Sequence, residues 1–245
     1  MKIGLQLYSV RDAAQENYAS MLSEVGKMGY DAVETAGFFG VSAEDFSAML
    51  EKTGMEIWGT HTQLKLLDED FDGMVAYHKA IGCKNLVFPH IPHGDADQVA
   101  TMVERINYYQ PLLEKEGITL HYHNHSSEFL PNKDGQIPFD FLVKETKVNF
   151  EFDTFWVYNA GLDPLELMET YRDRVKMIHL KDGFKQDFSN PESKPRGISV
   201  GSGEVPVDAI RAKAAELGMM VIVESEDLDP CGLEEVKRCM NYLKG

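Results

Sequence analysis

The sequence has few cysteines and few cationic residues. The three cysteines, Cys83, Cys231 and Cys239, are odd in number and form no CxxC pair. They therefore indicate reduced thiols rather than a disulfide framework. Lysine and arginine total 24 against 40 aspartate and glutamate residues, which gives a formal net charge of −16. Because such a surface repels nucleic acid phosphates and anionic membranes, we expect neither as a partner.

Long apolar runs are missing too. No stretch approaches the ~20 apolar residues of a membrane-spanning helix. The N-terminus enters a strand pattern at Lys2 to Leu5 without an apolar leader and cleavage site, so we expect a cytoplasmic protein. A glycine-rich phosphate loop is also absent around the first expected strand, where the sequence reads LQLYSVRD. That absence argues against an open, doubly wound sheet.

The chain of 245 residues, 43% of them hydrophobic, suits one large domain in which short apolar runs alternate with amphipathic stretches. The runs predict strands at Ile3–Leu7, Ala32–Thr35, Glu56–Thr60, Asn85–Phe88, Ile118–His123, Asn149–Asp153, Lys176–Leu180 and Met220–Glu224. The stretches predict helices near residues 12–28, 42–53, 69–81, 95–116, 138–146, 163–172, 206–217 and 231–244. Strict alternation implies a parallel sheet, and eight strands close a TIM-type barrel. We therefore predict an α/β fold, a single (β/α)8 TIM-barrel domain over residues 1–245, with the doubly wound sheet as the alternative.

One connection is long and polar, from residue 182 to residue 204. Long connections in compact domains are usually lids, binding loops or disordered segments. This one follows the seventh expected strand, on the face where such barrels carry their active sites. We therefore expect it to border the functional site.

Four strands of the second half end in histidine or carboxylate residues. These are His123 in ITLHYHNH, Asp153 in VNFEFDTFW, His179 in VKMIHLKDG and Glu224 in MVIVESED. Successive side chains of a strand point to opposite faces, and in each segment the polar group lies on the face opposite the apolar residues. In a barrel the apolar face packs on the helices, so all four groups are expected to face the lumen.

The mouth of such a barrel would be a polar cup. His61 and His90 follow earlier strands and would join the same four groups, because all strand ends converge there. Buried charges at this density must be paired, protonated or bound to a cation. A mixed nitrogen and oxygen ligand set suits Mn²⁺, Co²⁺, Zn²⁺ or Fe²⁺ better than Ca²⁺. The alternative is a hydrogen-bonded network without a metal.

Six segments in order resemble motif blocks of the sugar isomerase/epimerase superfamily with the xylose-isomerase-like TIM barrel. They are GLQLYSVRD, GYDAVET, YHNHSSEF, FEFDTFW, HLKDG and VIVESED, and together they cover essentially the whole chain. The resemblance implies one divalent metal ion, with Mn²⁺ expected and Zn²⁺, Co²⁺, Fe²⁺ or Mg²⁺ as alternatives. Asp153, His179 and Glu224 resemble the family's aspartate, histidine and last glutamate ligands.

The fifth strand departs from the family pattern, because His123 stands where the epimerases have a glutamate ligand. His123 can still bind a metal, but neutral imidazole is a poor substitute for a carboxylate base. Of the two glutamates that shuttle the proton in the family, Glu224 remains, and Glu128 or Glu151 could supply the other. The branch with YHNH at this strand is similar to the inosose dehydratases and to enzymes that handle 3-keto sugars.

The resemblance implies an enzyme acting on a keto sugar or keto polyol through an enediolate. We expect Glu224 to be the base, Glu128 or a histidine to return the proton, and the substrate to be bound by a set of four residues: His61, His90, Trp156 and Lys181. Return of the proton to carbon makes an isomerase or epimerase, whereas loss of a β-hydroxyl makes a dehydratase (lyase) of a keto-inositol or 3-keto sugar.

Two other classes compete with this expectation. Apurinic endonucleases share the barrel, but they bind about three metals and need a basic surface, which the net charge of −16 argues against. A non-catalytic sugar-binding barrel would not need the set of Asp153, His179 and Glu224. A small sugar or polyol is therefore the expected partner, and the resemblance also allows a homodimer.

Overall fold

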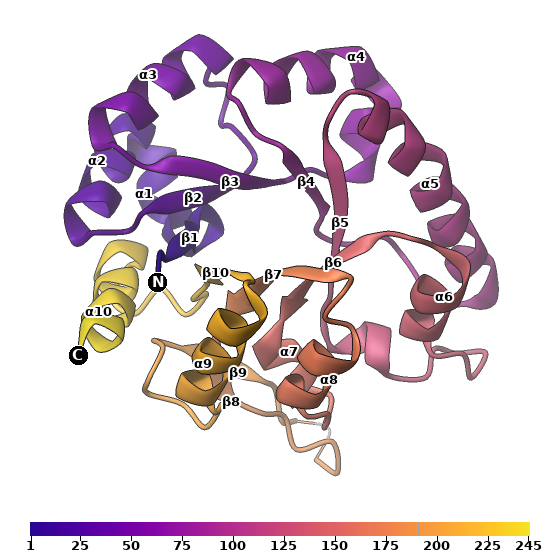
Figure 1. Ribbon diagram of the computed structural model, residues 1–245. Coiled ribbons are helices and arrows are strands. Elements are labelled where there is room, and N and C mark those ends of the chain that lie inside the picture. The colour runs from indigo at the N-terminus through magenta and orange to yellow at the C-terminus, as the bar shows by residue number, and fades with distance from the viewer. Residues whose placement is uncertain (191) are drawn as a thin grey trace.

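Eight parallel strands close into a barrel in the computed structural model, which describes residues 1–190 and 192–245 (Figure 1). The strands are β1 Gly4–Gln6, β2 Ala32–Ala36, β3 Glu56–His61, β4 Asn85–Phe88, β5 Thr119–His123, β6 Asn149–Asp153, β7 Val175–Leu180 and β10 Met220–Val223. Their order around the barrel is β1-β10-β7-β6-β5-β4-β3-β2. The predicted TIM-barrel fold is thus confirmed, and each expected strand lies within two residues of its predicted bounds.

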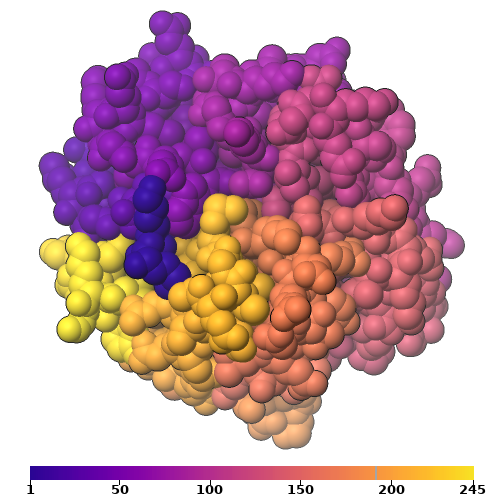
Figure 2. Space-filling view, in the orientation of Figure 1, coloured from indigo at the N-terminus to yellow at the C-terminus, as the bar shows by residue number. Residues whose placement is uncertain are grey.

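Helices surround the barrel and cover its outer face (Figure 1). They are α1 Arg11–Glu16, α2 Tyr18–Met28, α3 Ala43–Thr53, α4 Leu64–Ala80, α5 Ala96–Lys115, α6 Pro138–Glu145, α7 Thr154–Asn159, α8 Pro164–Thr170, α9 Val207–Leu217 and α10 Gly232–Lys244. The first and last strands pair in parallel, with Gly4 opposite Ile222. Figure 2 accordingly shows the indigo N-terminal segment lying against the yellow and orange C-terminal part. None of the helices within residues 1–190 and 192–245 is long and apolar enough to span a bilayer.

Two predicted helices differ from the observed ones. The single helix expected over residues 12–28 is interrupted at Asn17, whose backbone is extended (φ −160°, ψ 102°). The Asn17 side chain accepts a hydrogen bond from the Ser20 amide and so begins α2 as its N-cap. The helix expected over residues 69–81 begins earlier, at Leu64, and bends at Asp70, where φ is −154°.

The long connection has structure that the sequence did not predict. β8 (Asp182–Phe184) and β9 (Arg196–Ile198) pair antiparallel within it, while residue 191 of the expected loop lies outside the described residues. The buried Asp182 carboxylate accepts hydrogen bonds from four backbone amides: Gly183 (2.8 Å), Gly201 (2.9 Å), Gly203 (2.8 Å) and Val205 (3.1 Å). One side chain therefore organises the return of the chain from β7 to α9.

The barrel interior has an apolar layer and, at the C-terminal ends of the strands, a polar layer. Val87, Met177 and Ile222 form a small buried cluster inside the barrel, with Trp58 packed against it. Gly4 makes room for that indole, because a Cβ on Gly4 would lie 2.9 Å from a Trp58 ring carbon. The outer faces of the strands pack on the helices in a separate, much larger core. The apolar interior cluster leaves the strand ends above it to carry the polar side chains.

Candidate active site and metal centre

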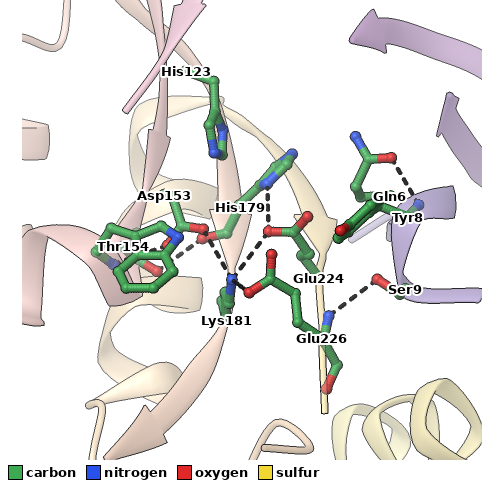
Figure 3. A network of polar contacts seen from close by, with 12 residues as sticks. Gln6, Tyr8, Ser9, His123, Asp153, Thr154, His179, Lys181, Glu224 and Glu226 are labelled. Atoms are coloured by element: carbon green, nitrogen blue, oxygen red, sulfur yellow. Dashed lines mark hydrogen bonds and ion pairs between the residues drawn. The ribbon is translucent and has the colours of Figure 1, made fainter. Parts of the chain in front are cut away.

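Neighbouring strand ends bring the four expected polar groups together (Figure 3). Asp153 of β6 is in register with His179 of β7, and His179 lies beside Ile222 of β10, two residues before Glu224. The residues next to them in the chain, such as Phe152 and Leu180, pack in the outer core. The strand phase predicted from the sequence therefore agrees with the direction of these side chains.

The donor atoms of His123, Asp153, His179 and Glu224 all lie within 4.8 Å of one another, and all four residues are buried. Asp153 Oδ1 accepts the Trp156 amide (3.0 Å) and caps α7, whereas Asp153 Oδ2 is buried and accepts no hydrogen bond from the residues that the structure describes. An unpaired buried carboxylate oxygen costs free energy unless a cation satisfies it. The arrangement thus fits a divalent ion held by two imidazoles and two carboxylates.

His179 lies at the centre of this group. Its Nδ1 is 3.3 Å from Glu224 Oε2, and its Nε2 is 2.7 Å from Oε2 of Glu34, a fully buried residue of β2. Gln6 also donates to Glu34 Oε2 (2.7 Å). A carboxylate that accepts from one ring nitrogen leaves the other nitrogen available to a metal.

Glu34 is a site residue that the sequence shows as a polar residue near the end of the second strand, but that was not among the expected site residues. The neighbouring strand β3 carries a glycine, Gly59, opposite Glu34. A Cβ on Gly59 would overlap the Glu34 carboxylate. A glycine inside a strand often marks such a close approach. A glycine inside one expected strand and a glutamate in the strand before it were thus the sequence features that could have indicated this contact.

A second layer of polar groups lies around Glu151. Its Oε2 is 2.8 Å from His61 Nε2, 3.2 Å from His123 Nδ1 and 3.3 Å from His179 Nε2. His61, His123, Glu151 and His179 could also hold a metal ion, whereas Glu151 Oε1 is buried without a partner. Glu151, left open by the sequence, therefore connects the imidazoles of three strands.

Burial and charge act against each other in this cluster. Burial alone would lower the pKa of His61, but the carboxylates of Glu34 and Glu151 raise it to about 10. Burial raises the pKa of Asp153 to about 7, even though the Lys181 ammonium opposes the rise. Burial would raise the pKa of Glu224 as well, but Lys181 and His179 hold it well below its usual range. Glu224 is therefore kept ionised by its neighbours, as is Glu151, whose pKa the histidines around it hold well below its usual range against the effect of burial.

Lys181 supplies the positive charge beside Glu224 (Figure 3). It is fully buried, and its Nζ lies 2.6 Å from Glu226 Oε2, 3.4 Å from Glu224 Oε2 and 3.9 Å from Asp153 Oδ2. The ammonium also lies 4.7 Å from the centre of the Trp156 ring. Lys181 and Trp156, both expected to contact substrate, thus lie beside the carboxylates but are not among the described residues that line the cavity over the site.

Glu128 belongs to a different group from Glu224. Its carboxylate accepts hydrogen bonds from the His125 amide (2.9 Å) and the Tyr122 hydroxyl (3.1 Å). The bond from the His125 amide caps the short 3₁₀ helix Ser126–Phe129. His90, His125 and Glu128 form a third set of possible ligands, and His90 is exposed. The structure therefore brings two of the expected residues, Glu128 and His90, together at the rim and not around His179.

A cavity of about 470 Å³ opens above the cluster, a size that suits a small-molecule ligand. The lining residues are Tyr8, Ala36, Gly37, His61, Gln63, Leu66, Pro89, His123, His125, Glu224 and Glu226. Two of the four expected metal ligands thus face the cavity directly.

Known proteins are similar to this chain in sequence or in fold over most of its length. A family model described as "Xylose isomerase-like TIM barrel" matches residues 22–243. The inosose dehydratase of Mesomycoplasma hyopneumoniae is 22% identical over 91% of this chain and 86% of its own length. The inosose dehydratase of Clostridium perfringens is 24% identical, with 80% and 76% covered. The crystal structure of a sugar phosphate isomerase/epimerase from Parabacteroides distasonis superposes with a TM-score of 0.82 at 27% identity, covering 99% of this chain and 93% of that one.

Proposed function

The chain belongs to the xylose isomerase-like TIM barrel family, and we propose that it is a divalent-metal-dependent enzyme that removes a proton beside the carbonyl of a keto sugar or keto polyol. In the first of two candidate reactions the proton returns to carbon, and the enzyme is an isomerase or epimerase. The observation that carries the proposal is the buried set of His123, Asp153, His179 and Glu224 at the floor of a sugar-sized cavity. We propose Mn²⁺ as the ion.

Asp153 Oδ2 supports a cation in this set, because it is buried, accepts no hydrogen bond among the described residues and has the Lys181 ammonium only at 3.9 Å. A divalent ion bound there would polarise the substrate carbonyl and so acidify the neighbouring C–H bond. His123 and His179 would contribute neutral nitrogen ligands, and Asp153 and Glu224 would contribute oxygen. The protein's own part is to hold these four groups rigidly on strand ends.

Glu224 is the proposed base. It lines the cavity, and the ammonium of Lys181 at 3.4 Å keeps the carboxylate ionised and able to accept a proton. Accepting the proton at Oε would leave negative charge on the substrate oxygen. The Lys181 ammonium, which lies 4.7 Å from the centre of the Trp156 ring, is positioned behind the base.

Return of the proton falls to a histidine in this proposal. His125 lines the cavity, and its buried Nδ1 has no hydrogen-bond partner among the described residues. Glu128 acts through His125, because it binds the His125 backbone amide and the Tyr122 hydroxyl. His61, Gln63 and His90 would bind substrate hydroxyls around the rim.

Dehydration is the second candidate, and two observations favour it. Relatives of similar length are named inosose dehydratase. Within the described residues the cavity lining also has both of its carboxylates, Glu224 and Glu226, on the same segment. A one-sided arrangement suits removal of a proton followed by departure of a β-hydroxyl as water, without delivery of a proton to the opposite face of the carbon.

The experiment is solvent exchange in D₂O with Mn²⁺ and a panel of keto sugars and 2-keto-myo-inositol, followed by NMR. We expect metal-dependent loss of one C–H signal with at least one member, and Glu224→Gln should slow it by about 10²–10⁴-fold. Glu216→Gln, the same change on the outer surface of α9, is the matched control and should exchange at the wild-type rate. Exchange that persists in Glu224→Gln, or that needs no metal, would contradict the proposal.

A further inference from the structure

The charge of the cavity wall bears on which sugars can enter. Among the described residues that line it, Glu224 and Glu226 are carboxylates, and the imidazole held in its cationic form, His61, is already paired with the buried carboxylates of Glu34 (3.3 Å) and Glu151 (2.8 Å). No lysine or arginine is among them in the described part of the chain. A phosphate ester brings about two negative charges and needs cations or a row of backbone amides.

Lys181, the nearest buried ammonium, is already neutralised. Its Nζ contacts Glu226 (2.6 Å), Glu224 (3.4 Å) and Asp153 (3.9 Å), and the side chain is fully buried. One positive charge therefore faces three carboxylates. A phosphate at this position would compete with those carboxylates and would meet repulsion from each of them.

Arg11 lies just after the first strand, next to the cavity residue Tyr8, and its donors are engaged. Its guanidinium lies 4.2 Å from the centre of the Tyr8 ring. Two of its nitrogens donate to the backbone carbonyls of Tyr8 (2.9 Å) and Glu226 (3.1 Å). Arg11 thus ties the loop after β1 to the loop after β10 and is not part of the cavity lining.

The remaining lining suits a neutral polyol. His61, Gln63 and His125 offer groups that hydrogen-bond hydroxyls, while Leu66 and Pro89 offer apolar surface for the C–H faces of a sugar ring. The carbonyl end of the substrate lies at the Glu224 floor in the proposed function. A phosphate at the far end would therefore find no unpaired cation among these described lining residues, and a phosphate on the Glu226 side would meet the carboxylate that neutralises Lys181.

We propose that the enzyme takes an uncharged keto sugar or keto polyol and discriminates against the phosphorylated form, with Glu226 as a specificity-determining residue. The inference rests on the proposed function only for the direction in which the substrate lies. The structurally similar Parabacteroides distasonis protein is, by contrast, named a sugar phosphate isomerase/epimerase.

The test is binding, measured by saturation-transfer NMR so that turnover is not needed. The probes are matched pairs, D-fructose with D-fructose 6-phosphate and D-tagatose with D-tagatose 6-phosphate, together with 2-keto-myo-inositol and inorganic phosphate. We expect binding of a neutral probe, with its phosphorylated partner weaker by at least about tenfold. Glu226→Gln should narrow that gap several-fold, and Glu216→Gln, a matched charge change on α9, should leave it unchanged.

Three outcomes overturn the inference. The first is a phosphorylated probe that binds as tightly as its neutral partner, and the second is the absence of binding by any neutral probe. The third is inorganic phosphate that competes with a neutral probe in the wild type but not in Arg11→Gln, because Arg11 would then be a phosphate site. Failure of the proposed function looks different. Neutral binding without C–H exchange would refute the chemistry and keep the substrate class. Exchange with phosphorylated probes alone would keep the chemistry and refute the substrate class.

Discussion

Glu34 shows how a single buried residue can orient a proposed metal ligand, His179. Its Oε2 accepts from His179 Nε2 at 2.7 Å and from Gln6 Nε2 at 2.7 Å. This contact directs Nδ1 of His179 toward Glu224 and the proposed metal position. Because Gly59 leaves room for the carboxylate, Glu34 can reach the middle of the barrel from β2.

We expect Glu34→Gln to weaken metal binding by about 10–100-fold, since partners that orient metal-bound histidines have effects of this size. The measurement is titration calorimetry with Mn²⁺ alone, which reads affinity without turnover. Glu24→Gln, the same change at an exposed position of α2, is the control. Unchanged Mn²⁺ affinity in a folded Glu34→Gln protein would show that Glu34 has no part in orienting His179.

The four proposed ligands could be predicted because alternation along a strand fixes direction. His123, Asp153, His179 and Glu224 each follow an apolar residue of known phase, so the lumen side was readable. The partners of these groups were not readable in the same way. The contact between Glu34 and His179 spans 145 residues and depends on the barrel order, which the sequence pattern does not state.

At the scale of elements, the strands were more predictable than the connections. The sequence pattern did not predict α7 (Thr154–Asn159), because Asp153 both ends β6 and caps α7, so no polar linker separates the two elements. Asn17 explains another difference, since its cap divides an otherwise continuous amphipathic stretch. The β8–β9 ribbon was missed because it is held by the Asp182 side chain rather than by an alternating apolar pattern.

Asp182→Ala should destabilise the protein by about 3 kcal/mol, because four backbone amides lose a buried charged acceptor. For a chain of this size that loss lowers Tm by roughly 6–12 °C. Thermal unfolding measures the change, and hydrogen exchange should show lost protection around Gly201 and Gly203. Asp187→Ala, an exposed carboxylate of the same connection, is the control and should change Tm little. Equal Tm values for the two variants would mean that Asp182 does not hold the ribbon.

The whole molecule combines a barrel that several chemistries use with a strongly acidic composition. Closure of β1 on β10 brings residues from both halves of the chain to one mouth, so Gln6 and Glu34 meet His179 there. The fold alone therefore cannot separate a sugar enzyme from a DNA-repair enzyme. Charge can separate them, because DNA binding depends on cations that neutralise phosphates.

With a formal net charge of −16, the protein should bind an abasic DNA duplex with a dissociation constant weaker than about 0.1 mM at physiological salt. Like charges repel the backbone, and the repulsion grows as salt is removed, so lowering the salt should not rescue binding. Fluorescence anisotropy with a labelled abasic duplex and its intact counterpart, with Mn²⁺ present, makes the measurement. Micromolar binding that tightens at low salt would mean that a local cationic surface outweighs the net charge, and it would return the apurinic endonuclease class to consideration.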